Sequence, residues 1–187
     1  MNALIVADAH LYRTPDGSVW TETIYGYEFW QRYLEVFETI SVAARMSNVD
    51  YSSVKGFLRS DGANVSFKPM PMARSSKEYL INFFNFVSAS RNAVKDEKCA
   101  IVRLPSFQAL FLYRSIRKKG IPFAVEVVAD PSIVNNGIIS QILKRQINKA
   151  VLEANGVAYV TKYALQNSFG SRVRIILMCS FTTSLAL

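Results

Sequence analysis

Residues 99–166 alternate apolar runs with amphipathic segments, and this alternation constrains the fold more than any other feature. Three apolar runs, CAIVRLPS, FAVEVVADP and GVAYVTK, are typical of buried strands. The segments between them repeat apolar residues every three or four positions, as amphipathic helices do. Strands that alternate with helices favour a parallel sheet with right-handed crossovers. The sequence therefore predicts an α/β fold, a Rossmann-like parallel sheet flanked by helices.

Polar residues follow each of these three predicted strands. Arg103 and Ser106 follow the first, Asp130 the second, and Thr161 and Lys162 the third. Ligands of open α/β sheets bind beyond the carboxyl ends of the strands, so we expect a polar, anion-binding cleft there. Ordinary loop starts and helix caps are the alternative interpretation of the same residues.

The rest of the chain supplies further predicted elements. We expect strands at residues 2–7, 39–45 and 64–68, a last strand at 174–179, and helices at 25–37, 77–93, 106–119 and 136–153. Residues 8–24 are predicted to form a long loop, of a kind usually functional or disordered, and residues 69–71 an irregular connector. The side chains expected to face the core are Tyr79, Phe83, Phe84 and Phe86 of one helix and Ile139, Ile142, Leu143, Ile147 and Val151 of another.

Length and charge limit the classes of protein that remain. The 187 residues suffice for one well-buried α/β unit, so residues 1–187 are expected to form a single domain. The formal net charge of +8 favours an anionic partner such as a nucleotide, a lipid-linked phosphate or a membrane surface. The other explanation of this positive charge is that it contributes to solubility alone. No nucleic-acid partner is expected.

Several familiar chemistries lack their motifs. The chain has no GxGxxG, no P-loop and no GxSxG, so dehydrogenase, P-loop and α/β-hydrolase interpretations lose their main support. His10 is the only histidine, and Cys99 and Cys179 lie far apart, so we expect no metal and no cofactor. The N-terminus has no basic segment and no apolar run reaches membrane-spanning length, which makes a cytoplasmic location the default expectation.

Four segments, and the order of elements around them, resemble one enzyme family. The segments are LIVADAHLYRTPDGSVWTETIYGYEFWQRYLEVF, VRLPS, GIPFAVEVVADP and AYVTKYALQ. They are similar to the N-terminal half of GT-B glycosyltransferases, above all the retaining, family 4 type that builds bacterial surface polysaccharides. The resemblance covers residues 1–168 and implies one half of a GT-B architecture, the half that mainly binds the acceptor.

The resemblance also implies roles for individual residues. The turn Asp16-Gly17-Ser18 matches a loop whose backbone approaches the donor phosphates, where glycine avoids a Cβ clash. Arg103 and Ser106 match the polar strand exit that faces the cleft. Asp130 matches the acidic catalytic position, although Ala129 replaces the histidine that many relatives have before it. The acceptor side of the cleft is assigned to His10, Glu126, Thr161 and Lys162.

These observations support three hypotheses. In the first, the chain is the acceptor-side domain of a sugar transferase, which uses a nucleotide-sugar donor and a saccharide or lipid-linked acceptor but is inactive without the donor-binding half. In the second, it is a binding module that pairs with a separate donor-domain chain. In the third, it is a self-contained α/β enzyme that uses His10, Asp16 and Asp130. Truncation, a frameshift and a genuine stand-alone half all fit the end of the chain at Leu187.

Basic residues on two predicted helices suggest peripheral attachment to the inner face of a membrane. Each cation near an anionic surface contributes about 1 kcal/mol, so three or four on one face suffice for weak binding. A solvated helix face is the alternative. The candidates are Arg114, Arg117, Lys118, Lys119, Lys144, Arg145 and Lys149.

Overall fold

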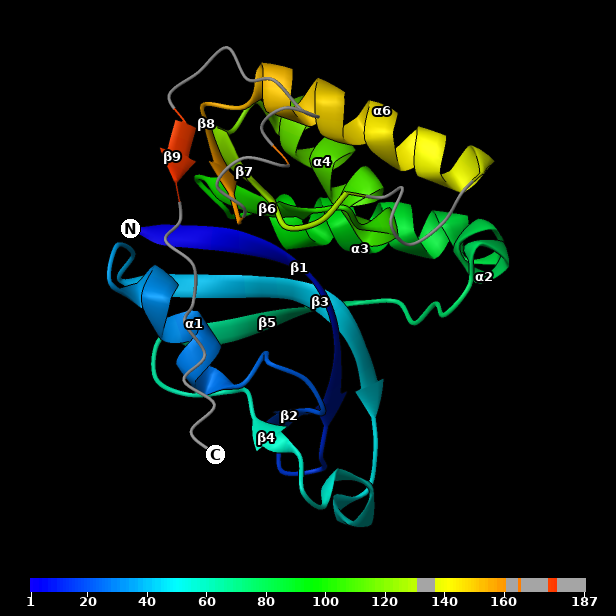
Figure 1. Cartoon of the computed structure of the whole chain (residues 1–187). Coiled ribbons are helices and arrows are strands. Elements are labelled where there is room, and N and C mark those ends of the chain that lie inside the picture. Colours follow the sequence, from blue (N-terminus) through cyan, green and yellow to red (C-terminus); the bar gives the residue numbers. More distant parts are fainter. Residues whose placement is uncertain (131–136, 161–164, 166–174, 178–187) are drawn as a thin grey trace, which may run out of the picture.

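The computed structural model describes residues 1–130, 137–160, 165 and 175–177 (Figure 1). Its helices are α1 (Tyr27–Leu34), α2 (Ser76–Ile81), α3 (Phe83–Val94), α4 (Phe107–Lys119) and α6 (Ile138–Glu153), with a 3-10 turn, η1 (Tyr51–Val54). Its strands are β1 (Asn2–Arg13), β2 (Val19–Thr21), β3 (Thr39–Asn48), β4 (Leu58–Arg59), β5 (Val65–Met70), β6 (Ala100–Leu104), β7 (Phe123–Val127), β8 (Gly156–Tyr159) and β9 (Ile175–Leu177).

The described strands join in one sheet, most of which is parallel. Its parallel part has the order β5-β3-β1-β6-β7-β8-β9, so strand order reverses between β1 and β6. That order is the one found in doubly wound nucleotide-binding sheets. β2 and β4 extend the far end of β1 as antiparallel strands. The predicted Rossmann-like α/β fold is confirmed.

Helices cover the two faces of this sheet unequally. α1 packs on one face, where Trp30 belongs to the same apolar cluster as Ala3 and Ile5 of β1. α3, α4 and α6 cover the other face, where Leu4 and Val6 join a larger cluster (Figure 1). The two sets alternate along β1 because successive side chains of a strand point to opposite faces.

The first strand is much longer than predicted. The prediction of a strand that ends at Ala7, followed by a loop over residues 8–24, is wrong. β1 runs on to Arg13, and a short turn connects it to β2. Ala9 and Leu11 are buried in this extension, which pairs with β3. The polar residues that suggested a loop lie at alternate, more exposed positions of a strand.

The connector predicted at residues 69–71 is also partly wrong. β5 continues through Pro69 to Met70, and Pro69 lies opposite Ala44 of β3. Proline lacks the N–H that a ladder needs, so it is tolerated on edge strands. In the described structure β5 pairs with β3 alone, which makes it such an edge.

The helix predicted at residues 77–93 is divided in two. Asn82 ends α2 and precedes α3, with backbone angles outside the helical region. Tyr79 and Phe86 are buried as expected, but Phe83 is 42% exposed and Phe84 82% exposed. The break rotates the two halves of the aromatic stripe relative to each other, so its prediction as core is wrong for Phe83 and Phe84.

The later elements follow the prediction closely. α4 and α6 lie where helices were expected, and β9 falls within the predicted last strand. Ile147 and Val151 of α6 are buried, whereas Ile142 is 42% exposed, contrary to expectation. Within the described ranges, no helix is both long and apolar enough to cross a membrane.

Gly120 ends α4 in the left-handed conformation, with φ of 72°, and its N–H donates to the Ile116 carbonyl at 3.0 Å. Because a Cβ is disfavoured at this φ, we expect Gly120→Ala to lower the free energy of unfolding by about 1 kcal/mol. Chemical denaturation measures this. Gly156→Ala is the control, since its Cβ would meet only the Ala124 Cβ at 3.9 Å. Equal stability of the two variants would contradict the prediction.

Candidate functional site

A bulge in β1 lies at the point where strand order reverses. Between the pairs Val6–Ala43 and His10–Arg45, three residues of β1 lie opposite one residue of β3. Pairing of β1 with β6 stops just before this bulge, at Val6. Asp8 is the middle residue of the bulge and is exposed between buried neighbours. Bulges re-aim side chains near functional sites, and in doubly wound sheets ligands bind at this reversal.

The start of α4 holds the bulge in place. Gln108 is fully buried, and its amide nitrogen donates to the Ala7 carbonyl. Ser106 is the N-cap of α4 and accepts a hydrogen bond from the Ala109 N–H at 3.4 Å. Two partners from α4 and its cap therefore adjoin the bulge that carries Asp8.

Asp8 forms an ion pair with Arg45 of β3. The Asp8 Oδ1 and Arg45 Nη2 atoms lie 3.0 Å apart, with 43% of the Asp8 side chain and 19% of the Arg45 side chain exposed. Arg45 also donates to the Ala73 carbonyl at 2.8 Å, which fixes its guanidinium. Desolvation raises the pKa of Asp8 above its usual value, while Arg45 and the Ser106 hydroxyl favour the charged form. The pair thus offers an accessible carboxylate with a fixed cation beside it.

His10 extends this group along β1. Its Nε2 lies 3.0 Å from the Ser47 hydroxyl, and its ring packs on Tyr12 with centroids 4.3 Å apart. Desolvation lowers the pKa of His10 below 6.5, and the positive charges of Arg45 and Arg74 lower it further. His10 is therefore mostly neutral at pH 7, able to donate or accept a hydrogen bond.

Removing the positive charge of Arg45 should raise the pKa of His10. We expect this for Arg45→Gln, because the variant loses a positive charge that disfavours the protonated ring. An NMR pH titration can follow the ring directly, since His10 is the only histidine. Arg59→Gln is the control, as this exposed arginine pairs with Asp61 instead. An unchanged pKa in Arg45→Gln would disprove the electrostatic coupling.

The structure brings two predicted site residues together, but buries them. Arg103 of β6 and Glu126 of β7 are register partners and form an ion pair, with side chains 8% and 6% exposed. Tyr33 of α1 donates to both Glu126 carboxylate oxygens at 3.0 Å and accepts from Arg103 at 3.1 Å. Arg32 approaches Glu126 at 3.5 Å, and Phe29 lies under both guanidinium groups. These residues join α1 to the sheet.

Breaking this buried pair should destabilise the protein strongly. We expect Glu126→Gln to lower the free energy of unfolding by about 3 kcal/mol or more, because it leaves Arg103 buried without its counter-charge. Denaturant titration measures the loss. Glu35→Gln, at an exposed position of the turn after α1, should change stability little. Equal stabilities for these two variants would show that the pair lacks this structural role.

Asp16, Gly17 and Ser18 lie far from the strand reversal. They form the turn between β1 and β2, where Asp16 accepts from the Ser18 N–H at 3.1 Å and from the Thr14 hydroxyl at 2.6 Å. Six residue steps along the strand lead from Ala7 to Arg13, which corresponds to about 20 Å. These hydrogen bonds lower the pKa of Asp16. The turn therefore does not meet the other predicted site residues.

Asp130 follows β7 and lies 3.7 Å from Lys144 of α6, with 18% of its side chain exposed. Thr161 and Lys162 fall outside the described residues. Of the predicted residues, His10 and Ser106 adjoin the bulge.

Sequence reasoning missed the residues that build this site. Asp8, Arg45 and Gln108 are not among the residues that the sequence predicts for a site. An acidic residue inside an otherwise apolar run was the one available signal for Asp8. Nothing local identifies Arg45 or Gln108, because both act across more than thirty residues of sequence.

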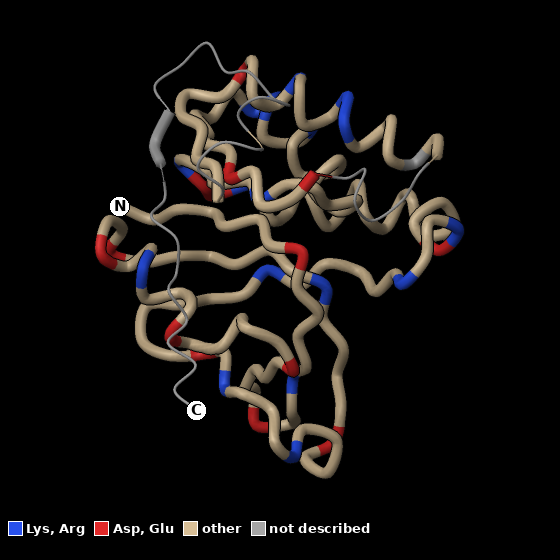
Figure 2. The backbone as a smooth tube through the Cα atoms, viewed as in Figure 1, with Lys and Arg blue, Asp and Glu red and all other residues tan. Residues whose placement is uncertain are grey.

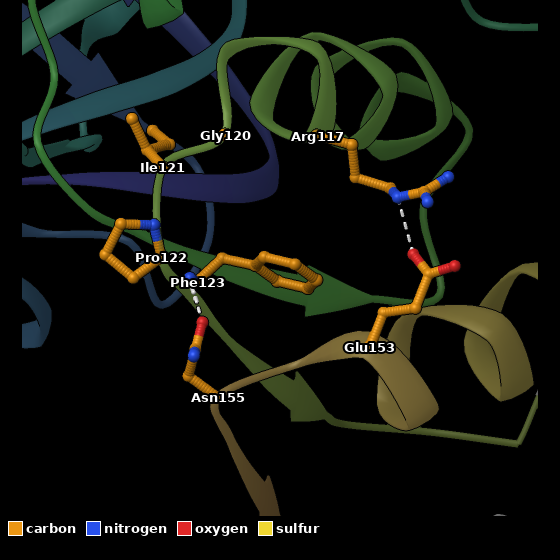
Figure 3. A pocket seen from close by; sticks show the side chains of 7 residues that line it. All are labelled: Arg117, Gly120, Ile121, Pro122, Phe123, Glu153 and Asn155. Atoms are coloured by element: carbon orange, nitrogen blue, oxygen red, sulfur yellow. Dashed lines mark hydrogen bonds and ion pairs between the residues drawn. The ribbon is translucent and has the colours of Figure 1, made fainter.

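A pocket of about 430 Å³ opens at the opposite edge of the sheet (Figure 3). Its polar side chains already have partners: Arg117 and Glu153 lie 2.6 Å apart, and Asn155 accepts from the Phe123 N–H at 3.0 Å. It lies at the amino end of β7, so we interpret it as a junction between helices and sheet. No cluster of potential metal ligands occurs among the residues that the structure describes.

Comparison with known proteins gives one informative similarity. The chain is 26% identical to protein CapJ of Staphylococcus aureus over 152 residues, which is 78% of this chain and 38% of CapJ. The chain thus spans well under half the length of that relative. No family model matches it.

Proposed function

We propose that this chain is the acceptor-side domain of a retaining GT-B glycosyltransferase that acts in the synthesis of a bacterial surface polysaccharide. The strand order and the resemblance of its sequence segments support the GT-B half. The similarity to CapJ, a name that refers to capsule biosynthesis, supports the polysaccharide setting. The nucleotide-sugar donor then binds on another domain or chain.

The observation that carries the proposal is the group of Asp8, Arg45 and His10 at the strand reversal. Asp8 offers a partly exposed carboxylate, which accepts hydrogen bonds from vicinal sugar hydroxyls. Arg45 and neutral His10 supply donors beside it. This set recognises a hydroxyl-rich or phosphorylated acceptor without a metal.

Binding of saccharides tests the proposal directly. We expect oligosaccharides released from a staphylococcal capsular polysaccharide to shift the NMR signals of the His10 ring, and UDP-N-acetylglucosamine to cause no shift and no transfer. Asp8→Asn should weaken saccharide binding at least tenfold, because charge-assisted hydrogen bonds are lost. Asp96→Asn, at an exposed position between α3 and β6, is the matched control.

Two results would contradict the proposal. One is sugar transfer from UDP-N-acetylglucosamine by the chain alone. The other is saccharide binding that survives Asp8→Asn unchanged. An additional variant, Asp16→Asn, distinguishes the group around Asp8 from the β1–β2 turn. If the turn binds the donor phosphates, the chain must have affinity for the nucleotide sugar, and this variant must alter that affinity.

A further inference from the structure

We propose that a groove between α3 and α4 docks the protein on the surface of an anionic membrane. The groove has a volume of about 640 Å³ and combines aromatic and basic side chains. We call it the aromatic–basic groove and define it by its three aromatic and three basic residues: Phe83, Phe84, Phe111, Arg91, Arg114 and Lys118.

The aromatic end connects the core to solvent. Phe86 is fully buried and stacks on Phe111 with ring centroids 5.1 Å apart, and Phe111 contacts Phe83 at 5.5 Å. Phe83 in turn contacts Phe84 edge-on at 5.5 Å, and Phe84 is 82% exposed. A rigid row of rings therefore supports an aromatic side chain that projects from the surface.

Further apolar side chains are exposed just before α3 in the sequence. Leu80 and Ile81 at the end of α2 are 75% and 71% exposed. Together with Phe84 they place three large apolar side chains within five residues of the break at Asn82. Exposed apolar patches mark protein or membrane contacts. A large apolar patch beside cations is typical of surfaces that lie in the lipid headgroup region.

The basic end carries positive charges that the protein does not neutralise. In the described part of the chain, Arg91, Arg114 and Lys118 form no recorded ion pair or side-chain hydrogen bond. Two neighbouring cations of α4 are occupied: Arg117 pairs with Glu153, and Lys119 donates to three carbonyls at and just after the end of α3. The groove thus holds three cations that remain available for an external anion.

Charge favours a lipid surface over an apolar protein partner. None of the described residues that line the groove is acidic. Arg114 and Lys118 also border a second hollow with Lys149 of α6, so the basic surface continues across α4. Figure 2 shows Lys and Arg recurring along this helical layer, which lies opposite α1. A broad anionic plane complements such an extended surface better than a single site does.

This surface differs from the one that the sequence suggested. Arg117, Lys119 and Lys144 were expected to contact lipid, but each has a partner within the protein. The apolar contribution of α2 and α3 was not expected, because the stripe containing Phe84 was interpreted as core.

Co-sedimentation with vesicles tests the proposal. We expect binding to vesicles of phosphatidylcholine with 30% phosphatidylglycerol, on the order of tenfold weaker binding to pure phosphatidylcholine, and loss of binding as salt rises. Arg114→Gln/Lys118→Gln should weaken binding roughly 25-fold, about fivefold per cation. Phe84→Ser should weaken it on the order of tenfold, because the inserted apolar area is lost.

Matched variants and a second measurement keep the test decisive. Lys55→Gln/Lys98→Gln removes the same charge from exposed sites elsewhere, and Ile24→Ser removes an apolar side chain that is 68% exposed. Both should bind like the unaltered chain. Equal binding to both lipid types, or a Phe84-dependent dimer in ultracentrifugation without vesicle binding, would overturn the proposal. The vesicle assay contains no saccharide. Its outcome therefore does not depend on whether the proposed saccharide binding is confirmed.

Discussion

The pairing of β1 with three other strands is the constraint on which the rest of the structure depends. Its first half lies between β3 and β6, and its second half stays paired with β3 while its end pairs with β2. The bulge at Ala7–Ala9 shifts the register of β1 between these two halves. Gln108 satisfies the Ala7 carbonyl at this irregular point, where an unpaired buried carbonyl would be costly. The exposed position of Asp8 is a direct consequence of this geometry.

Polar residues near strand ends have two different fates in this protein. Arg103 and Glu126 lie near the ends of β6 and β7, but their side chains point to the face that α1 covers, where Tyr33 completes their hydrogen bonds. Asp8 lies at the edge itself and keeps an exposed carboxylate. A buried ion pair contributes little net stability, yet losing one partner is expensive. Arg103 and Glu126 are therefore tied to the packing of α1.

The two helical layers present different surfaces. On the α1 side, aromatic rings enclose the arginines: Arg32 lies 4.0 Å from the Phe29 ring centroid. On the other side, α3 and α4 leave arginines and a lysine beside exposed aromatic rings. The proposed acceptor site at the sheet edge and the proposed membrane surface use different elements.

The sequence by itself determined the features that obey local rules. The alternation of strand and helix, the limits of α4 between the Ser106 cap and Gly120, and the core positions of Tyr79 and Phe86 depend on spacing and capping within a few residues. Only the tertiary structure decided where β1 ends, since its extension is stabilised by pairing with β3 some thirty-five residues later. The same holds for Asp8 and for Phe84. Whether a side chain is buried, paired or exposed depends on long-range partners, and these are absent from any local pattern.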